Sequence, residues 1–336
     1  MSQVARLDER QPMPRGPGPL HAAARGRQLE RGTKILFALG EREEPAEALR
    51  HVLQLCELLE AELHVVRVVP EFAQLPTSAT STTAWGVTPI YVVPDEDRAV
   101  GETLDCMRAT SAWLASISRA DATAIQLQVL SGSFVEQTAA YAHSLGVELI
   151  AVPARPGRFG TTVTRLAQAA GVPVLVARAP RAAGSIVAAT DLTDQRYPVL
   201  RKASELGALL DASVVAVHNV APVAQVAGVG GALWAVPEEL GASVLELQRS
   251  RLEQASTRAP GDVEPVLATE RSPAEAILHE ASARDAELVL VGTRARTWLS
   301  RLMSGSVAAR VVNEATQSVM VTPLEPAESS TSRSVH

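Results

Sequence analysis

The chain has 336 residues, of which 46% are hydrophobic and 20% are charged, a composition typical of a folded globular protein with room for about two domains. The net charge of −6 gives no basis for a broad nucleic-acid-binding surface, and no stretch approaches the roughly 20 apolar residues that cross a membrane. Cys56 and Cys106 are far apart and lack Cys-x-x-Cys spacing, which argues against a disulfide framework or a zinc site.

The two ends of the chain have the composition of unfolded segments. Residues 1–32 are rich in Pro, Gly and Arg without apolar periodicity, so we expect a disordered, mildly basic leader. This leader lacks the apolar core of a secretory signal, so we expect the protein in the cytoplasm. The Ser-rich residues 324–336 predict a disordered tail.

From residue 33 onward, short apolar runs alternate with amphipathic stretches, which predicts βα units and a parallel sheet. A loop rich in Thr, Ser and Pro is expected at residues 76–94. The other elements expected in this half are, in chain order, strand 35–39, helix 45–60, strand 63–69, helix 96–119, strand 124–130, helix 134–145, strand 148–152, helix 161–169 and strand 172–177.

The same order of elements returns after a break at residues 179–184. The elements expected there are strand 186–190, helix 195–210, strand 213–220, helix 238–256, strand 263–268, helix 273–284, strand 288–291, a helix after Gly305 and strand 318–321. An internal repeat of roughly 150 residues indicates two copies of one domain. We therefore predict an α/β fold with two doubly wound, five-stranded parallel-sheet domains in tandem, at residues 33–180 (the first copy) and 184–323 (the second copy).

Two features of the second copy are candidates for a ligand site, because ligands of doubly wound sheets bind beyond the carboxyl ends of the strands where the strand order reverses. Thr190 and Asp191 follow the first strand, and a loop that we expect to begin at Gly292 follows the fourth. The loop leads to Gly305 and Ser306 at a predicted helix start, where free N–H groups and the helix dipole favour an anion. Gly-Ser before a helix is also an ordinary turn and N-cap, so this alternative stays open.

The loop has a recognisable spacing. Gly292 is followed by two residues, Ala295, nine residues, Gly305 and then Ser306. The same spacing, with glycine in place of Ala295, precedes Ser or Thr in the nucleotide loop of the universal stress protein family, which this chain resembles. Segments 188–191, 217–220 and 272–278 look like the family's first strand end, second strand and third-helix start. The resemblance covers about residues 33–323, as a tandem of two such domains.

The resemblance implies that the second copy binds ATP or a related adenine nucleotide, with or without Mg²⁺. Asp191 would accept hydrogen bonds from ribose hydroxyls, the end of strand 213–220 would face the base, and the glycine loop would hold phosphates. The candidate nucleotide-binding residues are Ala189, Thr190, Asp191, Asn219, Gly292, Arg294, Ala295, Gly305, Ser306 and Val307.

The sequence departs from the family pattern at several positions. Ala295 replaces a glycine, which costs on the order of 1 kcal/mol if the position needs a positive φ. The first copy departs further, because no acidic residue stands where Asp191 does and its shorter loop contains Pro153 and Pro156, which lack the N–H groups that a phosphate site uses. We therefore predict that the first copy does not bind ATP well and offers a partner surface.

The residues disfavour an enzyme. Neither lysine of the chain, Lys34 or Lys202, follows a glycine loop, and no nucleophile stands beside a base. No metal site is indicated, and His218 is more simply a packing residue than a catalytic one. Three hypotheses follow: a stress-response regulatory protein in which nucleotide changes conformation or partner choice, a nucleotide-free interaction scaffold with two degenerate sites, and an enzyme of nucleotidyl transfer. We expect the first.

Partner predictions follow from the two copies. The last strands, 172–177 and 318–321, would leave exposed edges unless they paired, and in the family these strands often meet across a dimer axis. We therefore expect an intrachain pseudo-dimer, with a homodimer of the whole chain left open. We expect an adenine nucleotide and an unknown protein as partners, and neither nucleic acid nor membrane.

Overall fold

The computed structural model describes residues 33–41, 44–69, 81–83, 86–88, 96–117, 125–157, 159–181, 184–220, 238–294 and 306–324. The predicted leader lies outside these ranges, and so does the predicted tail except for its first residue, Leu324, which ends the last strand. Among the helices of these ranges, none combines the length and the hydropathy that a bilayer crossing requires.

The first copy follows the predicted order of elements. It consists of β1 (Lys34–Leu39), α1 (Ala46–Leu59), β2 (Glu62–Val69), α2 (Glu96–Ile117), β5 (Gln126–Ser131), α3 (Phe134–Leu145), β6 (Leu149–Pro153), α4 (Phe159–Ala170) and β7 (Val174–Ala177). A small antiparallel pair, β3 (Ser81–Thr83) with β4 (Gly86–Thr88), lies within the segment predicted as a loop.

The second copy repeats this order. It consists of β8 (Ser185–Ala189), α5 (Pro198–Leu210), β9 (Ser213–Asn219), α6 (Glu238–Arg258), β10 (Val263–Ala268), α7 (Pro273–Ala283), β11 (Leu288–Arg294), α8 (Ser306–Glu314) and β12 (Ser318–Leu324).

Several predicted boundaries in the second copy are wrong, and the structure gives a physical reason for two of them. Helix α5 begins at Pro198 and not at residue 195, because Pro198 takes the first helical position and Tyr197 before it has a left-handed backbone (φ 45°). Gly292 does not end β11: the strand continues to Arg294 because β12 runs beside it as far as Leu324.

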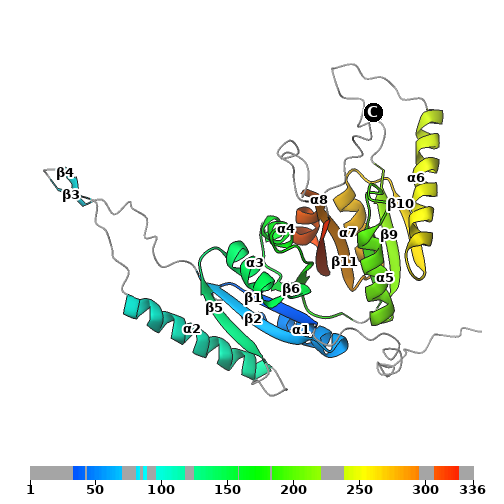
Figure 1. The fold of residues 1–336 in the computed structure, drawn as a ribbon. Helices are drawn as coiled ribbons and strands as arrows, with labels where there is room; N and C mark the ends of the chain where they lie inside the picture. The colour runs from blue at the N-terminus through cyan, green and yellow to red at the C-terminus, as the bar shows by residue number, and fades with distance from the viewer. Residues whose placement is uncertain are drawn as a thin grey trace, which may run out of the picture.

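The strands form one continuous sheet of ten strands in the described part of the chain (Figure 1). Its order is β10, β9, β8, β11, β12, β7, β6, β1, β2, β5, so each copy contributes five strands with its own first strand at the centre of its half. All neighbours within a copy are parallel. The prediction of two doubly wound, five-stranded parallel sheets is confirmed.

The two halves join edge to edge through their last strands. Strand β12 pairs antiparallel with β7, with Val319 opposite Val176 and Val321 opposite Val174. The predicted meeting of these strands within the chain is therefore present, and it removes the edge that each half would expose alone.

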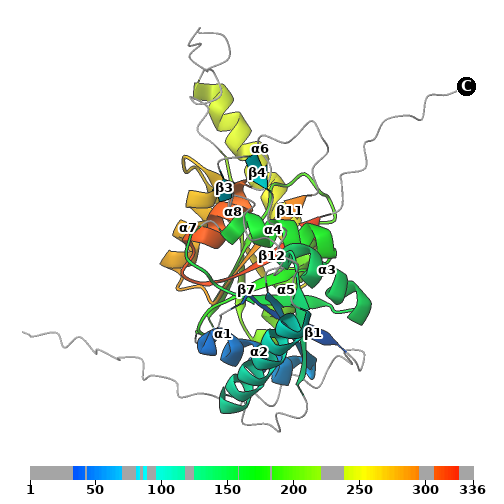
Figure 2. The same ribbon diagram turned by 90° about the vertical axis from the view of Figure 1, so that its left-hand side faces the viewer.

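Helices cover both faces of the sheet, and the apolar core has one layer on each side (Figures 1 and 2). Side chains of α3, α4, α7 and α8 pack on one face, and side chains of α1, α2, α5 and α6 pack on the other. Strands buried on both faces explain the near-continuous Val, Ile, Leu and Ala runs of the sequence. Because both layers extend across the β7–β12 pair, the two copies share one core.

A buried histidine crosses the junction between the copies. His51 of α1 is 7% exposed, and its Nδ1 lies 3.0 Å from the carbonyl oxygen of Arg178 and 3.2 Å from Oγ of Ser318, the first residue of β12. The Arg178 guanidinium is close by and donates to the Gln317 and Val312 carbonyls. Burial lowers the pKa of His51, and its hydrogen bond to the Arg178 carbonyl offsets this in part.

We expect His51 to make the folded protein acid-sensitive. Its pKa is lower in the folded than in the unfolded chain, so the unfolded chain binds the proton more tightly, and stability falls as the pH drops from the ordinary histidine pKa of about 6.5 to the lowered value. Urea denaturation at pH 7.5, 6.5 and 5.5 of wild type and of His51→Asn, which retains a donor for the Arg178 carbonyl, measures this. The wild type should lose more stability, by at most about 1.4 kcal/mol per pH unit; parallel curves would contradict the assignment.

Candidate nucleotide site

The carboxyl ends of three neighbouring strands of the second copy, β8, β9 and β11, surround a cavity of about 400 Å³. This is the point where the strand order reverses, because β8 is flanked by β9 on one side and β11 on the other. The cavity is lined by Ala189, Thr190, Asp191, Asp194, Tyr197, Pro198, Val199, Leu200, Val217, Asn219, Pro273, Ile277, Gly292, Thr293, Arg294, Val307 and Leu324.

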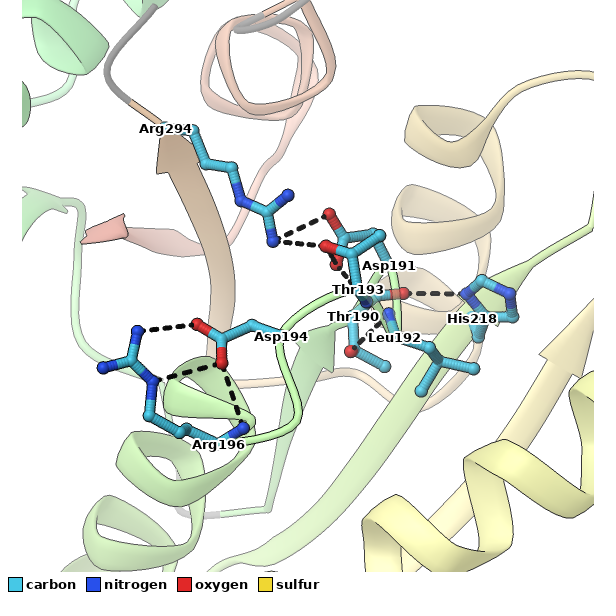
Figure 3. A network of polar contacts seen from close by, with 8 residues as sticks. All are labelled: Thr190, Asp191, Leu192, Thr193, Asp194, Arg196, His218 and Arg294. Carbon is cyan, nitrogen blue, oxygen red and sulfur yellow. Dashed lines mark hydrogen bonds and ion pairs between the residues drawn. The ribbon is translucent and has the colours of Figure 1, made fainter. Parts of the chain in front are cut away.

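The turn after β8 presents Asp191 to the cavity (Figure 3). Oδ1 of Asp191 accepts hydrogen bonds from the backbone N–H (3.0 Å) and the hydroxyl (2.8 Å) of Thr193, and the Thr190 hydroxyl accepts from the N–H of Leu192 (3.1 Å). Leu192 between them has a left-handed backbone (φ 57°). The side chains of the turn thus hold Asp191 in place through Oδ1 and leave Oδ2 for partners outside the turn.

Arg294, the last residue of β11, lies opposite Asp191. Its Nη2 is 3.4 Å from Asp191 Oδ2 and donates to the hydroxyl of Thr193. In Figure 3 the Arg294 side chain extends from the strand end toward the turn, so the carboxylate and the guanidinium meet at the cavity. The Asp191 side chain is 59% exposed, so this ion pair lies where solvent and a ligand can reach it and contributes little to stability.

A second carboxylate, which the sequence analysis did not single out, lines the same cavity. Asp194 accepts from the backbone N–H (3.0 Å) and the guanidinium Nε (3.3 Å) of Arg196. The backbone N–H of Arg196 lowers the pKa of Asp194 most, and the positive charges of Arg196 and Arg294 lower it further. Asp194 stands close before Pro198 at the start of α5, and a carboxylate near a helix start is the sequence signal that marks it.

The end of β9 is held to its neighbours by two polar side chains. Asn219 lines the cavity, but its amide bonds both backbone groups of Glu270, accepting from the N–H (2.8 Å) and donating to the carbonyl (3.2 Å). His218 Nδ1 lies 2.9 Å from the Thr190 carbonyl, which only accepts, so this nitrogen carries the proton. Both residues brace the strand ends, as the packing interpretation of His218 predicted.

The structure thus brings seven of the ten predicted site residues together. Those that line the cavity are Ala189, Thr190, Asp191, Asn219, Gly292, Arg294 and Val307. Gly292 does so from within β11, with Thr322 opposite it in β12. Ser306 is the first residue of α8, next to Val307. Ala295 and Gly305 lie outside the described residues.

Most of the remaining lining residues are apolar, including Val217 and Ile277. Sequence reasoning did not identify them as site residues, because an apolar residue at a strand end or on a helix reads the same whether it faces the core or a cavity.

The comparisons agree with this architecture. The universal stress protein family matches residues 32–178 and, a second time, residues 183–323. The chain belongs to the universal stress protein family. Among curated proteins, none matches this chain.

Two solved structures are similar to this universal stress protein over most of its length. One is a universal stress protein from Archaeoglobus fulgidus DSM 4304, with 13% identity, a TM-score of 0.56, and coverage of 86% of this chain and 98% of that one. Another is a protein of unknown function from Pseudomonas aeruginosa PAO1, with 17% identity, a TM-score of 0.51, and coverage of 86% and 92%. A shorter universal stress protein from Archaeoglobus fulgidus, in complex with dAMP, has 24% identity, a TM-score of 0.28, and coverage of 42% and 98%.

The first copy of this universal stress protein has different side chains at the corresponding strand ends. Gly40 stands where Asp191 does, and Pro153 where Gly292 does. Arg155, which corresponds to Arg294, lies between two aromatic rings, with its guanidinium carbon 4.9 Å from the ring centre of Phe134 and 4.5 Å from that of Phe159. These cation–π contacts occupy the starts of α3 and α4.

Proposed function

We propose that this universal stress protein binds one adenine nucleotide per chain, in the cavity of the second copy, and that binding regulates its conformation or its choice of protein partner in the stress response. The observation that supports this most directly is that Asp191 and Arg294 come from the ends of two different strands and meet at one cavity, at the point where the strand order reverses. A carboxylate and a guanidinium in one cavity match the ribose hydroxyls and the phosphate of a nucleotide.

The lining residues support a division of the cavity into two parts. Ala189 and Pro273, two apolar lining residues that are not buried, offer surface against which a purine can pack. Oδ2 of Asp191 can accept from a ribose hydroxyl, and Val307 brings the start of α8, with its free N–H groups, to the same cavity. A bound phosphate would give Arg294 an alternative partner to Asp191, which would free the carboxylate for the sugar.

The proposal is tested by thermal unfolding of the full chain with ATP and Mg²⁺, AMP, dAMP and adenosine, followed by calorimetric titration. A ligand at about 100 times its Kd stabilises the folded state by about 2.7 kcal/mol, which is readily seen as a rise in Tm. We expect such a rise with at least one nucleotide and a stoichiometry of one, because Arg155 stacks on Phe134 and Phe159 at the corresponding end of the first copy. Two sites per chain would contradict that assignment.

Thermal unfolding separates the proposal from the scaffold hypothesis, and a measurement of ATP turnover separates it from the enzyme hypothesis. No shift with any of the four ligands would favour a nucleotide-free scaffold, in which both copies serve only as interaction surfaces. We propose a cytoplasmic binding protein and not an enzyme, so ATP turnover should stay below about 1 s⁻¹, at the low end of typical enzyme rates. Steady turnover above that value would revive the hypothesis of nucleotidyl transfer.

A further inference from the structure

One polar side chain of the first copy reaches the candidate site of the second. Gln168 lies on α4, and its Nε2 is 2.9 Å from the hydroxyl of Thr293 and 2.7 Å from the carbonyl oxygen of Arg294. Thr293 is buried and Arg294 is the last residue of β11, and both line the cavity. A carbonyl oxygen only accepts, so the amide nitrogen of Gln168 must face it, and its two hydrogens serve both partners.

Gln168 has a counterpart at the same position of the second copy. Gln168 stands eight residues after Gly160, and Asn313 stands eight residues after Gly305, so the two side chains correspond in the two copies. Asn313 also crosses the junction, where its Oδ1 accepts from the backbone N–H of Gly160 at the start of α4 (2.7 Å). Each copy therefore sends one amide side chain across the junction, Gln168 to the end of β11 and Asn313 to the start of α4.

The two contacts end at different places. The one from Asn313 ends at the first copy, where Arg155, Phe134 and Phe159 pack together. The one from Gln168 ends at the second copy, on the backbone of the residue whose side chain pairs with Asp191. Only the Gln168 contact therefore touches the candidate ligand site, and it touches the side of the cavity to which we assign the phosphate.

We propose that Gln168 is a positioning residue through which the first copy holds the end of β11 in the geometry that binds the nucleotide's phosphate. This inference rests on the proposed function. It adds a role for the first copy, whose own strand ends carry other side chains than those of the second copy. Gln168 need not touch the ligand: it fixes the Arg294 backbone, and thereby the point from which the guanidinium extends.

The test compares Gln168→Met, which retains the side-chain length but lacks the donors, with the matched variant Asn313→Leu. The second variant removes the contact between Asn313 and the Gly160 N–H. AMP and adenosine are titrated into each full-length protein. Gln168→Met should weaken AMP binding about tenfold, as expected for the loss of one to two hydrogen bonds, and should change adenosine affinity less than about twofold. Asn313→Leu should leave both affinities within about twofold of wild type, whatever it does to Tm.

Hydrogen exchange of the ligand-free proteins supplies a readout that does not depend on nucleotide. The amides at the end of β11 should exchange faster in Gln168→Met and stay unchanged in Asn313→Leu. Equal AMP affinity of Gln168→Met and wild type, or an equal loss for AMP and adenosine, would overturn the proposal. If wild type binds no adenine nucleotide, the proposed function fails by itself, and unchanged exchange at the end of β11 would then also refute the positioning role.

Discussion

Replacing Gly160 by alanine is expected to destabilise the full chain by at least about 1–3 kcal/mol, although glycine to alanine in a helix is ordinarily stabilising. A Cβ atom on Gly160 would stand 2.1 Å from the carbonyl oxygen of Ala309 and 2.7 Å from its carbonyl carbon. Both atoms belong to the backbone of α8, so relief requires the two helices to move apart. Such a movement would also lengthen the hydrogen bond from the Gly160 N–H to Asn313.

The matched control is Gly101→Ala in α2. No atom of the described residues lies within 4 Å of a Cβ atom placed there, so this variant should gain roughly 0.5–1 kcal/mol from the higher helix propensity of alanine. Urea denaturation of both variants and wild type gives the two free-energy differences. A neutral or stabilising Gly160→Ala would mean that α4 and α8 do not pack this closely in solution.

This close approach shows why the relation between the copies was only partly predictable. The pairing of β7 with β12 follows from the sequence through a general rule, that an unpaired apolar edge strand needs a partner. The crossing of α4 and α8 does not follow from any such rule, because nothing in the sequence around Gly160 indicates a contact with a second helix. In the structure the same glycine is the contact point between helices of two copies.

The elements themselves were predictable because their apolar patterns are long and unambiguous. Runs such as Ile35–Leu39 are buried on both faces of the sheet, so they read as parallel strands without knowledge of their neighbours. The extension of β11 past Gly292 was missed, because a glycine ends a strand only if no neighbouring strand continues beside it. Strand β12 does continue there, and a single segment does not reveal that.

The candidate site was also predictable only in part from the sequence. Gly292 belongs to a spacing that the sequence displays directly, Asp191 follows a predicted strand, and the structure places both at one cavity. The ion pair between Asp191 and Arg294 joins residues about a hundred positions apart, and so does the contact of Gln168 with Arg294. Such contacts depend on the strand order and on how side chains extend from it, neither of which local patterns encode.

Asp191→Asn is expected to weaken the binding of adenosine and AMP by about ten- to a hundredfold, the effect of losing one hydrogen bond to a charged acceptor. The asparagine oxygen can still accept from the N–H and hydroxyl of Thr193, so the turn keeps its geometry. Its NH₂ group then replaces Oδ2, which is the acceptor left for a ribose hydroxyl. Asp105→Asn, a change of the same charge on the exposed face of α2, should leave both affinities unchanged.

Arg294→Met distinguishes the phosphate side of the site from the ribose side and complements the Asp191→Asn variant. Removing the guanidinium takes away a positive charge from the phosphate side and releases Asp191 Oδ2 from its ion pair. AMP binding should therefore weaken by about tenfold, the loss of a charge-assisted hydrogen bond, whereas adenosine binding should stay equal or become tighter. Calorimetric titration of both ligands into Asp191→Asn, Arg294→Met and wild type measures the pattern. Equal losses for adenosine and AMP in Arg294→Met would show that Arg294 does not contact the phosphate. Unchanged binding in Asp191→Asn would show that Asp191 does not contact the ribose.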